Sequence, residues 1–184
     1  MDNLSPETEI LLSEKNYPLI PLRGVCVFPG MRLTFEPEGE RASAALKAAM
    51  EEDRLIFVSA LRDTSEEEPF TAAKLQPIGT VCRVLQTIRV PEDNAVQAMI
   101  EGVSRAGLRS VDMQEDYYIA GAEVIDTPWD SRTAVKAEAL IRQCYGLFEE
   151  YSQTIGTDAR DVFLGIIDSE DPGYIADQII QNIY

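Results

Sequence analysis

The residue types that most often perform chemistry in proteins are scarce in this sequence. It contains no histidine, which removes the most common general base, proton shuttle and metal ligand. It contains no Gly-rich phosphate-binding loop of either common pattern and no G-x-S-x-G nucleophile elbow. The four lysines, Lys15, Lys47, Lys74 and Lys136, lie outside the Gly-rich or apolar contexts that activate an amine. We therefore predict no catalytic and no cofactor-binding residue in this chain.

Cysteines and acidic residues are the remaining candidates for a metal site or a nucleophile. Cys26, Cys82 and Cys144 are widely spaced among apolar residues and form no C-x-x-C pair, which favours buried free thiols over a zinc site or a disulfide framework. The run Glu66–Glu68 could hold a cation only if other ligands converged on it, so we predict a solvated acidic loop and no metal site. A hydrolase built on a carboxylate pair stays open, because acidic residues are abundant.

Composition and charge narrow the function further. Of the 184 residues, 45% are hydrophobic and 26% charged, as in an ordinary soluble protein with one domain or a domain and a small appendage. The net charge of −16, with no cluster of basic residues, argues against nucleic-acid binding. No apolar run approaches the roughly 18 residues of a membrane span. The acidic first residues lack the pattern of a signal peptide. We expect a cytoplasmic protein that binds neither nucleic acid nor membrane.

Residues 17–128 consist mainly of short apolar runs separated by turn residues, which predicts β-strands. Six runs of strand length are separated by turn residues: Tyr17–Leu22, Met31–Pro37, Arg54–Arg62, Ile78–Val90, Ala95–Val103 and Tyr117–Ile125. The residues PEDN between the fourth and fifth runs have the composition of a hairpin turn. One helix is predicted within Gly39–Asp53, with the apolar stripe Ala42, Ala45, Leu46, Ala49 and Met50. Short, mostly hairpin-linked strands with one helix predict a small barrel or sandwich, capped by the helix.

After residue 128 the hydrophobic period becomes about 3.6, which predicts helices. The first carries Ala137, Leu140, Ile141, Cys144, Leu147, Phe148 and Tyr151. Thr157 can cap a second, and Asp171 can cap a third that has Pro172 at its first position. We thus predict an α+β chain with a flexible leader over residues 1–16, a β-barrel subdomain over 17–128 and a helical subdomain over 129–184. The last helix reaches Tyr184 without a polar tail, so we expect a truncated piece of a longer protein.

Several ordered motifs resemble the N-terminal domain of Lon proteases. PLIPLRGVCVFPGM, residues 18–31, is similar to that family's P-L-x-P-L-R run and F-P-G-M turn. PIGTVCRVLQTIRV, residues 77–90, resembles its G-T-x-x-x-I/V-L-Q strand, and the following hairpin leads to its G-x-x-R-A motif at residues 102–106. EDPGYIADQIIQNI, residues 170–183, resembles its P-G-x-L-A-D helix. The resemblance covers about residues 17–184, nearly the whole chain.

The resemblance implies a fold and a function. The fold would be a PUA-like β pseudo-barrel followed by an α-helical bundle. The parent would be a hexameric, cytoplasmic, ATP-dependent protease that degrades misfolded and selected regulatory proteins. Its N-terminal region would help to recognise unfolded or degradation-tagged substrates and support assembly. The ATPase module, with its ATP and magnesium, and the Ser-Lys protease module would lie downstream, so this chain itself would be no enzyme. The alternative is a stand-alone adaptor that carries this domain without an ATPase.

The corner formed by Pro21, Leu22, Arg23, Phe28, Pro29 and Gly30 has two interpretations. In the structural one, the prolines fix φ, Gly30 supplies a turn with positive φ, and Arg23 pairs with a carboxylate or backbone carbonyls. In the functional one, this loop contacts a substrate or another domain. We favour the structural interpretation, because such turns commonly serve geometry first.

Two surfaces are candidates for contacts with other proteins. Unfolded substrates share no sequence, so they require exposed, adaptable apolar side chains; we predict Met31, Leu33, Phe35, Phe70 and Met113 as candidates. Core packing is the competing interpretation for each of them. The last predicted helix presents Ile175, Ile179, Ile180 and Ile183, which we predict as a face for self-association into dimers or larger species.

Overall fold

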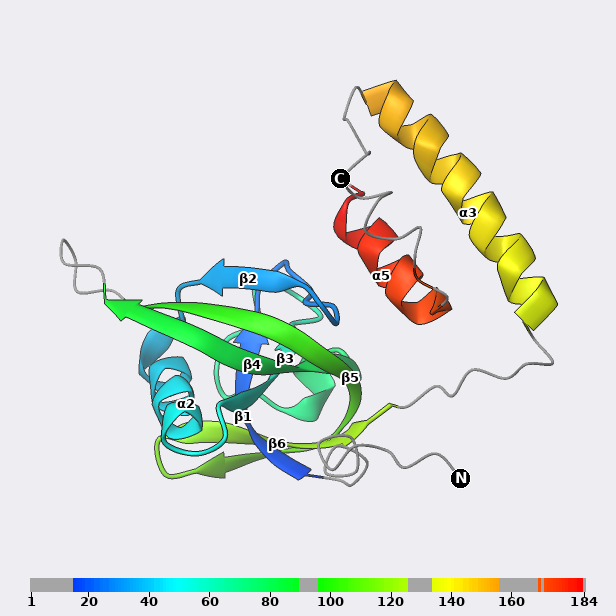
Figure 1. The fold of residues 1–184 in the computed structure, drawn as a ribbon. Helices are drawn as coiled ribbons and strands as arrows, with labels where there is room; N and C mark the ends of the chain where they lie inside the picture. The colour runs from blue at the N-terminus through cyan, green and yellow to red at the C-terminus, as the bar shows by residue number, and fades with distance from the viewer. Residues whose placement is uncertain (1–14, 90–95, 126–133, 156–168, 170, 184) are drawn as a thin grey trace. The chain divides into compact units, whose positions relative to one another are not determined.

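The computed structural model describes residues 15–89, 96–125, 134–155, 169 and 171–183, in two units, Met1–Asp126 and Thr127–Tyr184. The first unit contains a sheet and a helix that packs on it, and the second contains helices (Figure 1). The mixed α+β class is thus confirmed. None of the helices among the described residues is long and apolar enough to cross a membrane.

The sheet of the first unit closes on itself. Its strands are β1 (Lys15–Leu22), β2 (Arg32–Phe35), β3 (Leu55–Ala60), β4 (Ile78–Arg89), β5 (Val96–Gln114) and β6 (Tyr117–Val124). They are ordered β2-β5-β4-β3-β1-β6, and β5 also pairs with β6. The strands β5, β4, β3, β1 and β6 therefore form a ring. β2 is not part of it and pairs with the first half of β5. The sequence left barrel and sandwich open, and this closure shows a barrel. β1 begins two residues earlier than predicted, since Lys15 and Asn16 pair with β6.

β5 closes the ring because it changes partner along its length. Its first half pairs with β4 and β2, and its second half pairs with β6. Where the partner changes, Val81 faces Ser104 and Cys82 faces Gly102, so that Val103 has no opposite residue. Such a bulge bends a strand and increases its twist. The predicted strand at residues 95–103 is only the first half of this element.

Helix α2 (Gly39–Glu51) covers one side of the sheet. It lies in the connection between β1 and β3, which pair in parallel as such crossovers require. Its stripe Ala42, Ala45, Leu46 and Ala49 is buried, as the spacing predicted, and Met50 is partly buried. The small alanines allow the helix backbone to approach the sheet closely.

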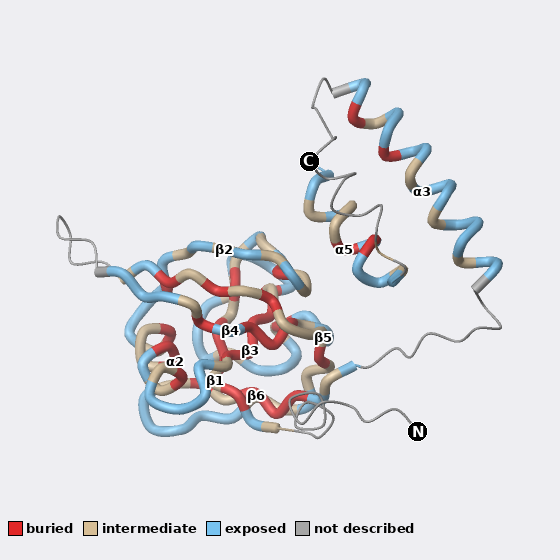
Figure 2. The backbone as a smooth tube through the Cα atoms, in the orientation of Figure 1, coloured by how far each residue is buried: buried red, intermediate tan, exposed pale blue. Residues whose placement is uncertain are grey.

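Two clusters of buried side chains lie on opposite faces of the central strands. On β3, Ile56 and Val58 belong to the cluster that α2 covers, while Phe57 between them belongs to the other. Successive strand residues point to opposite faces, so the run Ile56–Val58 is apolar on both faces of the sheet and not on one alone. Figure 2 shows this buried centre. Tyr118, Ala120 and Ala122, at alternate positions of β6, belong to the second cluster.

The second unit contains α3 (Ala134–Ile155) and α5 (Pro172–Gln181), which contact each other. The carboxylate of Asp171 accepts hydrogen bonds from the amides of Gly173 and Tyr174 at 2.8 and 3.3 Å, which confirms the predicted cap. α3 is confirmed as well, but Leu140 and Leu147 on it are exposed. The predicted helix that begins at Thr157 and the PEDN turn lie outside the described residues.

Candidate functional site

The corner at residues 28–31 is held against β5 by its backbone. Gly30 has a φ of 78°, and the amide of Met31 donates to the carbonyl of Phe28 at 3.0 Å. The amide of Gly30 donates to the carbonyl of Gly102, and the amide of Gly102 donates to the carbonyl of Met31, both at 2.9 Å. These bonds fix the direction in which the chain enters β2. The geometry therefore supports a structural role for the corner.

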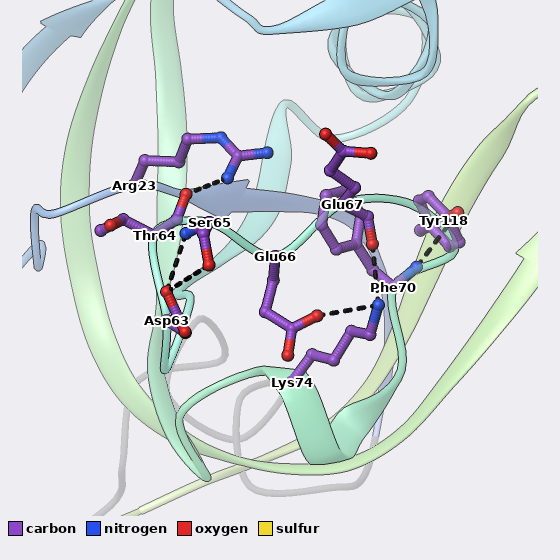
Figure 3. A network of polar contacts seen from close by, with 9 residues as sticks. All are labelled: Arg23, Asp63, Thr64, Ser65, Glu66, Glu67, Phe70, Lys74 and Tyr118. Carbon is purple, nitrogen blue, oxygen red and sulfur yellow. Dashed lines mark hydrogen bonds and ion pairs between the residues drawn. The ribbon is translucent and has the colours of Figure 1, made fainter.

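Arg23 joins three segments that are distant in sequence. Its Nε donates to Oε2 of Glu38, the residue just before α2, at 2.6 Å. Its Nη1 donates to the carbonyl of Thr64, as Figure 3 shows. The arginine itself follows β1 directly. This confirms the expected pairing with a carboxylate and a backbone carbonyl, and it ties the loop after β3 to the start of the helix.

The loop over residues 61–75 is ordered by its own acidic side chains. Asp63 accepts hydrogen bonds from the amide and hydroxyl of Ser65 at 2.9 and 2.7 Å, and these bonds lower the pKa of its carboxyl group. Nζ of Lys74, in the short helix η2 (Ala72–Lys74), lies 2.9 Å from Oε2 of Glu66 and donates to the carbonyl of Glu67 at 2.8 Å (Figure 3). The carboxylates thus organise the loop through hydrogen bonds and ion pairs.

A pocket of about 250 Å³ lies between this loop, β1, the start of α2 and β6. Phe70 and Tyr118 meet edge to face in it, with ring centroids 5.7 Å apart. Arg41 lies 5.5 Å from the centre of the Tyr118 ring and forms an ion pair with Glu68. An aromatic wall with both charges at its rim suits contact with side chains of another polypeptide.

Three buried side chains of the first unit that could carry chemistry, those of Ser59, Thr80 and Cys82, have structural surroundings. The buried hydroxyls of Ser59 and Thr80 donate to the carbonyls of Gln76 and Val27, so they serve the fold. Burial raises the pKa of the Cys82 thiol to about 12, which keeps it protonated. No group of three or more Cys, Asp or Glu that could hold a metal ion occurs among the described residues.

The prediction of three buried thiols is wrong for two of them. Cys82 is buried, whereas Cys26 and Cys144 are exposed. Cys26 lies in the segment between β1 and β2, next to Val27, which is buried. Cys144 lies on α3 between the exposed residues Leu140 and Leu147.

The predicted contact residues fall into two groups. Met31, Leu33 and Phe35 are partly buried and pack against the cluster under α2. Phe70 packs beside Tyr118, and Met113 lies opposite Tyr118 in the β5–β6 register with 48% of its surface exposed. Directly opposite residues share a face of the sheet, so Phe70 and Met113 both flank Tyr118. Sequence reasoning missed Tyr118 and Arg41, because only the closed sheet brings them to the loop.

The predicted self-association face is split by the fold. Ile175 is buried and Ile179 partly buried, whereas Ile180 and Ile183 remain 46% and 41% exposed. Half of the predicted face therefore packs inside the helical unit, and the other half is accessible.

Comparison with known proteins agrees with these observations. The chain is 35% identical over 181 residues to a Lon protease of Clostridioides difficile (strain 630), covering 93% of this chain and 23% of that protein. It is 27% identical to Lon protease 1 of Bacillus subtilis (strain 168), covering 92% of this chain and 21% of that protein. The chain thus spans little more than a fifth of the length of these relatives.

A solved structure shares the fold. The N-terminal domain of the Lon protease from the Mycobacterium avium complex superposes with a TM-score of 0.68 at 19% identity, covering 89% of this chain and 80% of that one. The model of the ATP-dependent protease La (LON) substrate-binding domain family matches residues 16–183. With this match over nearly its whole length, the chain belongs to the family of LON substrate-binding domains.

Proposed function

We propose that this chain is the non-catalytic N-terminal part of an ATP-dependent Lon protease and binds the unfolded or regulatory proteins that the protease degrades. The observation that carries the proposal is the match to the LON substrate-binding domain over residues 16–183. The relatives named Lon protease, of which this chain covers little more than a fifth, support the existence of further modules. ATP, magnesium and a Ser-Lys dyad would belong to those modules.

We place one contact with clients at the surface formed by Phe70 and Met113, which flank the buried ring of Tyr118; it is called the aromatic surface below. Met113 is exposed, flexible and unbranched, which suits partners of varied shape. Phe70, held edge to face against the buried Tyr118 ring, adds a fixed aromatic side chain to this surface. Met31, Leu33 and Phe35 would contribute less, since they already pack against the protein core.

We propose that assembly uses the exposed end of α5. Ile180 and Ile183 are accessible for contact with a second copy, as a hexameric parent requires, whereas Ile175 is not. A cytoplasmic location fits the exposed free thiols of Cys26 and Cys144, because exposed thiols persist in reducing compartments.

A stand-alone adaptor is the second candidate function, since the domain could bind proteins without an attached ATPase. The gene sequence beyond codon 184 decides between the two. A Walker A motif downstream supports the protease, and a stop codon at that point supports the adaptor.

Fluorescence anisotropy with an unfolded polypeptide tests the binding function. The probe is labelled α-lactalbumin, reduced and carboxymethylated so that it cannot fold; the folded, disulfide-intact protein is the control. Both partners are acidic, so attraction between net charges cannot drive the complex. We expect weak, saturable binding to the unfolded form alone, unchanged between about 0.1 and 0.5 M NaCl. No binding, or binding that disappears with salt, would contradict the proposal.

A pair of variants tests the aromatic surface. Met113→Ser should weaken the binding of the unfolded probe severalfold, because it removes the most exposed apolar side chain of that surface. Ile78→Ser is the matched control, since Ile78 is 54% exposed but belongs to no part of the surface. Equal loss in both variants would refute this placement.

A further inference from the structure

A second groove lies between α2 and the end of β4, away from the aromatic surface. It has a volume of about 490 Å³, within the range of ligand-binding pockets. It is lined by Ser43, Ala44, Leu46, Lys47 and Met50 of α2, by Thr87 and Ile88 of β4, and by Val96 of β5. Ile88 is 47% exposed. Adjacent residues of a strand point to opposite faces, so a groove lined by both Thr87 and Ile88 opens along the edge of β4.

That edge of β4 has no strand beside it among the described residues. Pairing with β3 ends where Arg83 faces Leu55, and the amide of Val84 makes one further bond to the carbonyl of Arg54 at 2.8 Å. β4 nevertheless continues to Arg89, paired with β5 on its other side (Figure 1). The last residues of β4 therefore form a one-sided strand that faces the groove.

The register shows which backbone groups point outward. The amide of Gly102 on β5 bonds to Met31, on the side of β2. Because backbone groups alternate between the two sides of a strand, Met99 and Gln97 of β5 face β4. Their partners on β4 are Gln86 and Ile88. Thr87 lies between these two, so its N–H and C=O point away from β5 and toward the groove.

We propose that this groove binds an extended segment of a client polypeptide as an additional strand along β4. The inference rests on the proposed function and names the conformation in which the client binds. An unpaired N–H and C=O at a strand edge are matched by the backbone of another extended chain. The partly buried Met50 and the exposed Ile88 supply apolar contacts for its side chains. Backbone pairing needs no particular sequence, which suits clients that share none.

The variant Thr87→Pro tests the proposal. Proline removes the outward N–H of residue 87 but none of the bonds that Gln86 and Ile88 make with β5, and proline is tolerated at strand edges. The matched control Thr87→Val keeps both the side-chain shape and the N–H. We expect Thr87→Pro to bind the unfolded α-lactalbumin probe about five- to tenfold more weakly, as for one lost hydrogen bond. Thr87→Val should bind like the unchanged protein.

Each outcome separates this inference from the proposed function. If the unchanged protein binds no unfolded probe, the proposed function fails and the inference fails with it. If Thr87→Pro binds as tightly as Thr87→Val, the inference is overturned and the proposed function stands. If sedimentation shows a dimer that only Thr87→Pro abolishes, the edge binds a second copy, and a client as its occupant is refuted.

A measurement on the ligand does not depend on the folding of any variant. A short, apolar, extended peptide is compared with the same peptide N-methylated at alternate residues, which removes the donors along one edge. We expect the N-methylated peptide to bind at least about fivefold more weakly. Equal affinity of the two peptides would overturn strand addition.

Discussion

The contact between the corner at residues 28–31 and β5 gives a sharp stability prediction. A Cβ atom added to Gly102 would lie 2.1 Å from the carbonyl oxygen of Phe28 and 2.8 Å from its carbonyl carbon. Ordinary contacts of a Cβ begin at 3.4 Å. The substitution Gly102→Ala must therefore move the corner by more than about 1 Å, because backbone atoms cannot rotate away as a side chain can.

That movement disturbs the hydrogen bonds that Gly102 shares with Gly30 and Met31, each 2.9 Å long. Overpacking of this kind costs about 1–3 kcal/mol, and each weakened hydrogen bond costs up to about 1 kcal/mol. We expect a loss of about 2–4 kcal/mol in the free energy of unfolding. For a unit of this size it corresponds to a fall in Tm of roughly 10 °C.

Thermal unfolding followed by circular dichroism checks this value. Gly107→Ala is the matched control on the same strand, since the nearest atom to its added Cβ, the carbonyl oxygen of Glu123, is 3.9 Å away. Both substitutions reduce the entropy of the unfolded chain equally, so their difference reports the contact. A Tm for Gly102→Ala within about 2 °C of the Tm for Gly107→Ala would refute the reasoning.

Three further predictions follow from single side chains. Arg23→Ala should lower Tm by several degrees without changing affinity for the unfolded probe, whereas Arg32→Ala, which removes an exposed ion pair with Glu101, should change Tm little. Iodoacetamide at neutral pH should label two of the three thiols in the native protein, and mass spectrometry should find Cys82 unlabelled, since burial raises its pKa to about 12. Burial disfavours the charged form of Asp53, but the hydrogen bonds that its carboxylate accepts from Lys15 and Leu55 outweigh this and lower its pKa. Asp53→Asn should therefore lower the free energy of unfolding at neutral pH by less than about 1 kcal/mol. Chemical denaturation should show the difference between the two proteins shrinking as the pH falls below 3.8.

Much of the first unit is predictable from local patterns. The stripe of α2 has helical spacing, and its small residues pack as that spacing requires. The corner is recognisable because its prolines restrict φ and Gly30 permits the positive φ that the turn requires. The cap at Asp171 is local too, because its donors are the amides of Gly173 and Tyr174, two and three residues further along the chain.

The remainder depends on contacts between distant residues. The bulge at Val103 leaves no mark in the sequence, yet it lies on β5 between the residues that pair with β2 and those that pair with β6. The contact between Arg41 and Tyr118 joins residues 77 positions apart and exists only once the ring of strands is closed. Cys26 illustrates a local error: its apolar neighbours suggested burial, yet only Val27 beside it is buried and Cys26 itself is exposed.

The central claim is that this chain binds unfolded polypeptides through defined surfaces. Amide chemical-shift mapping of the isotopically labelled 184-residue chain against unfolded α-lactalbumin tests it most directly. We predict saturable shifts concentrated at Phe70, Tyr118 and Met113 and at Thr87 and Ile88, with none in the presence of the folded protein. The absence of shifts, or shifts spread over the acidic surface that disappear when salt is added, would contradict the claim.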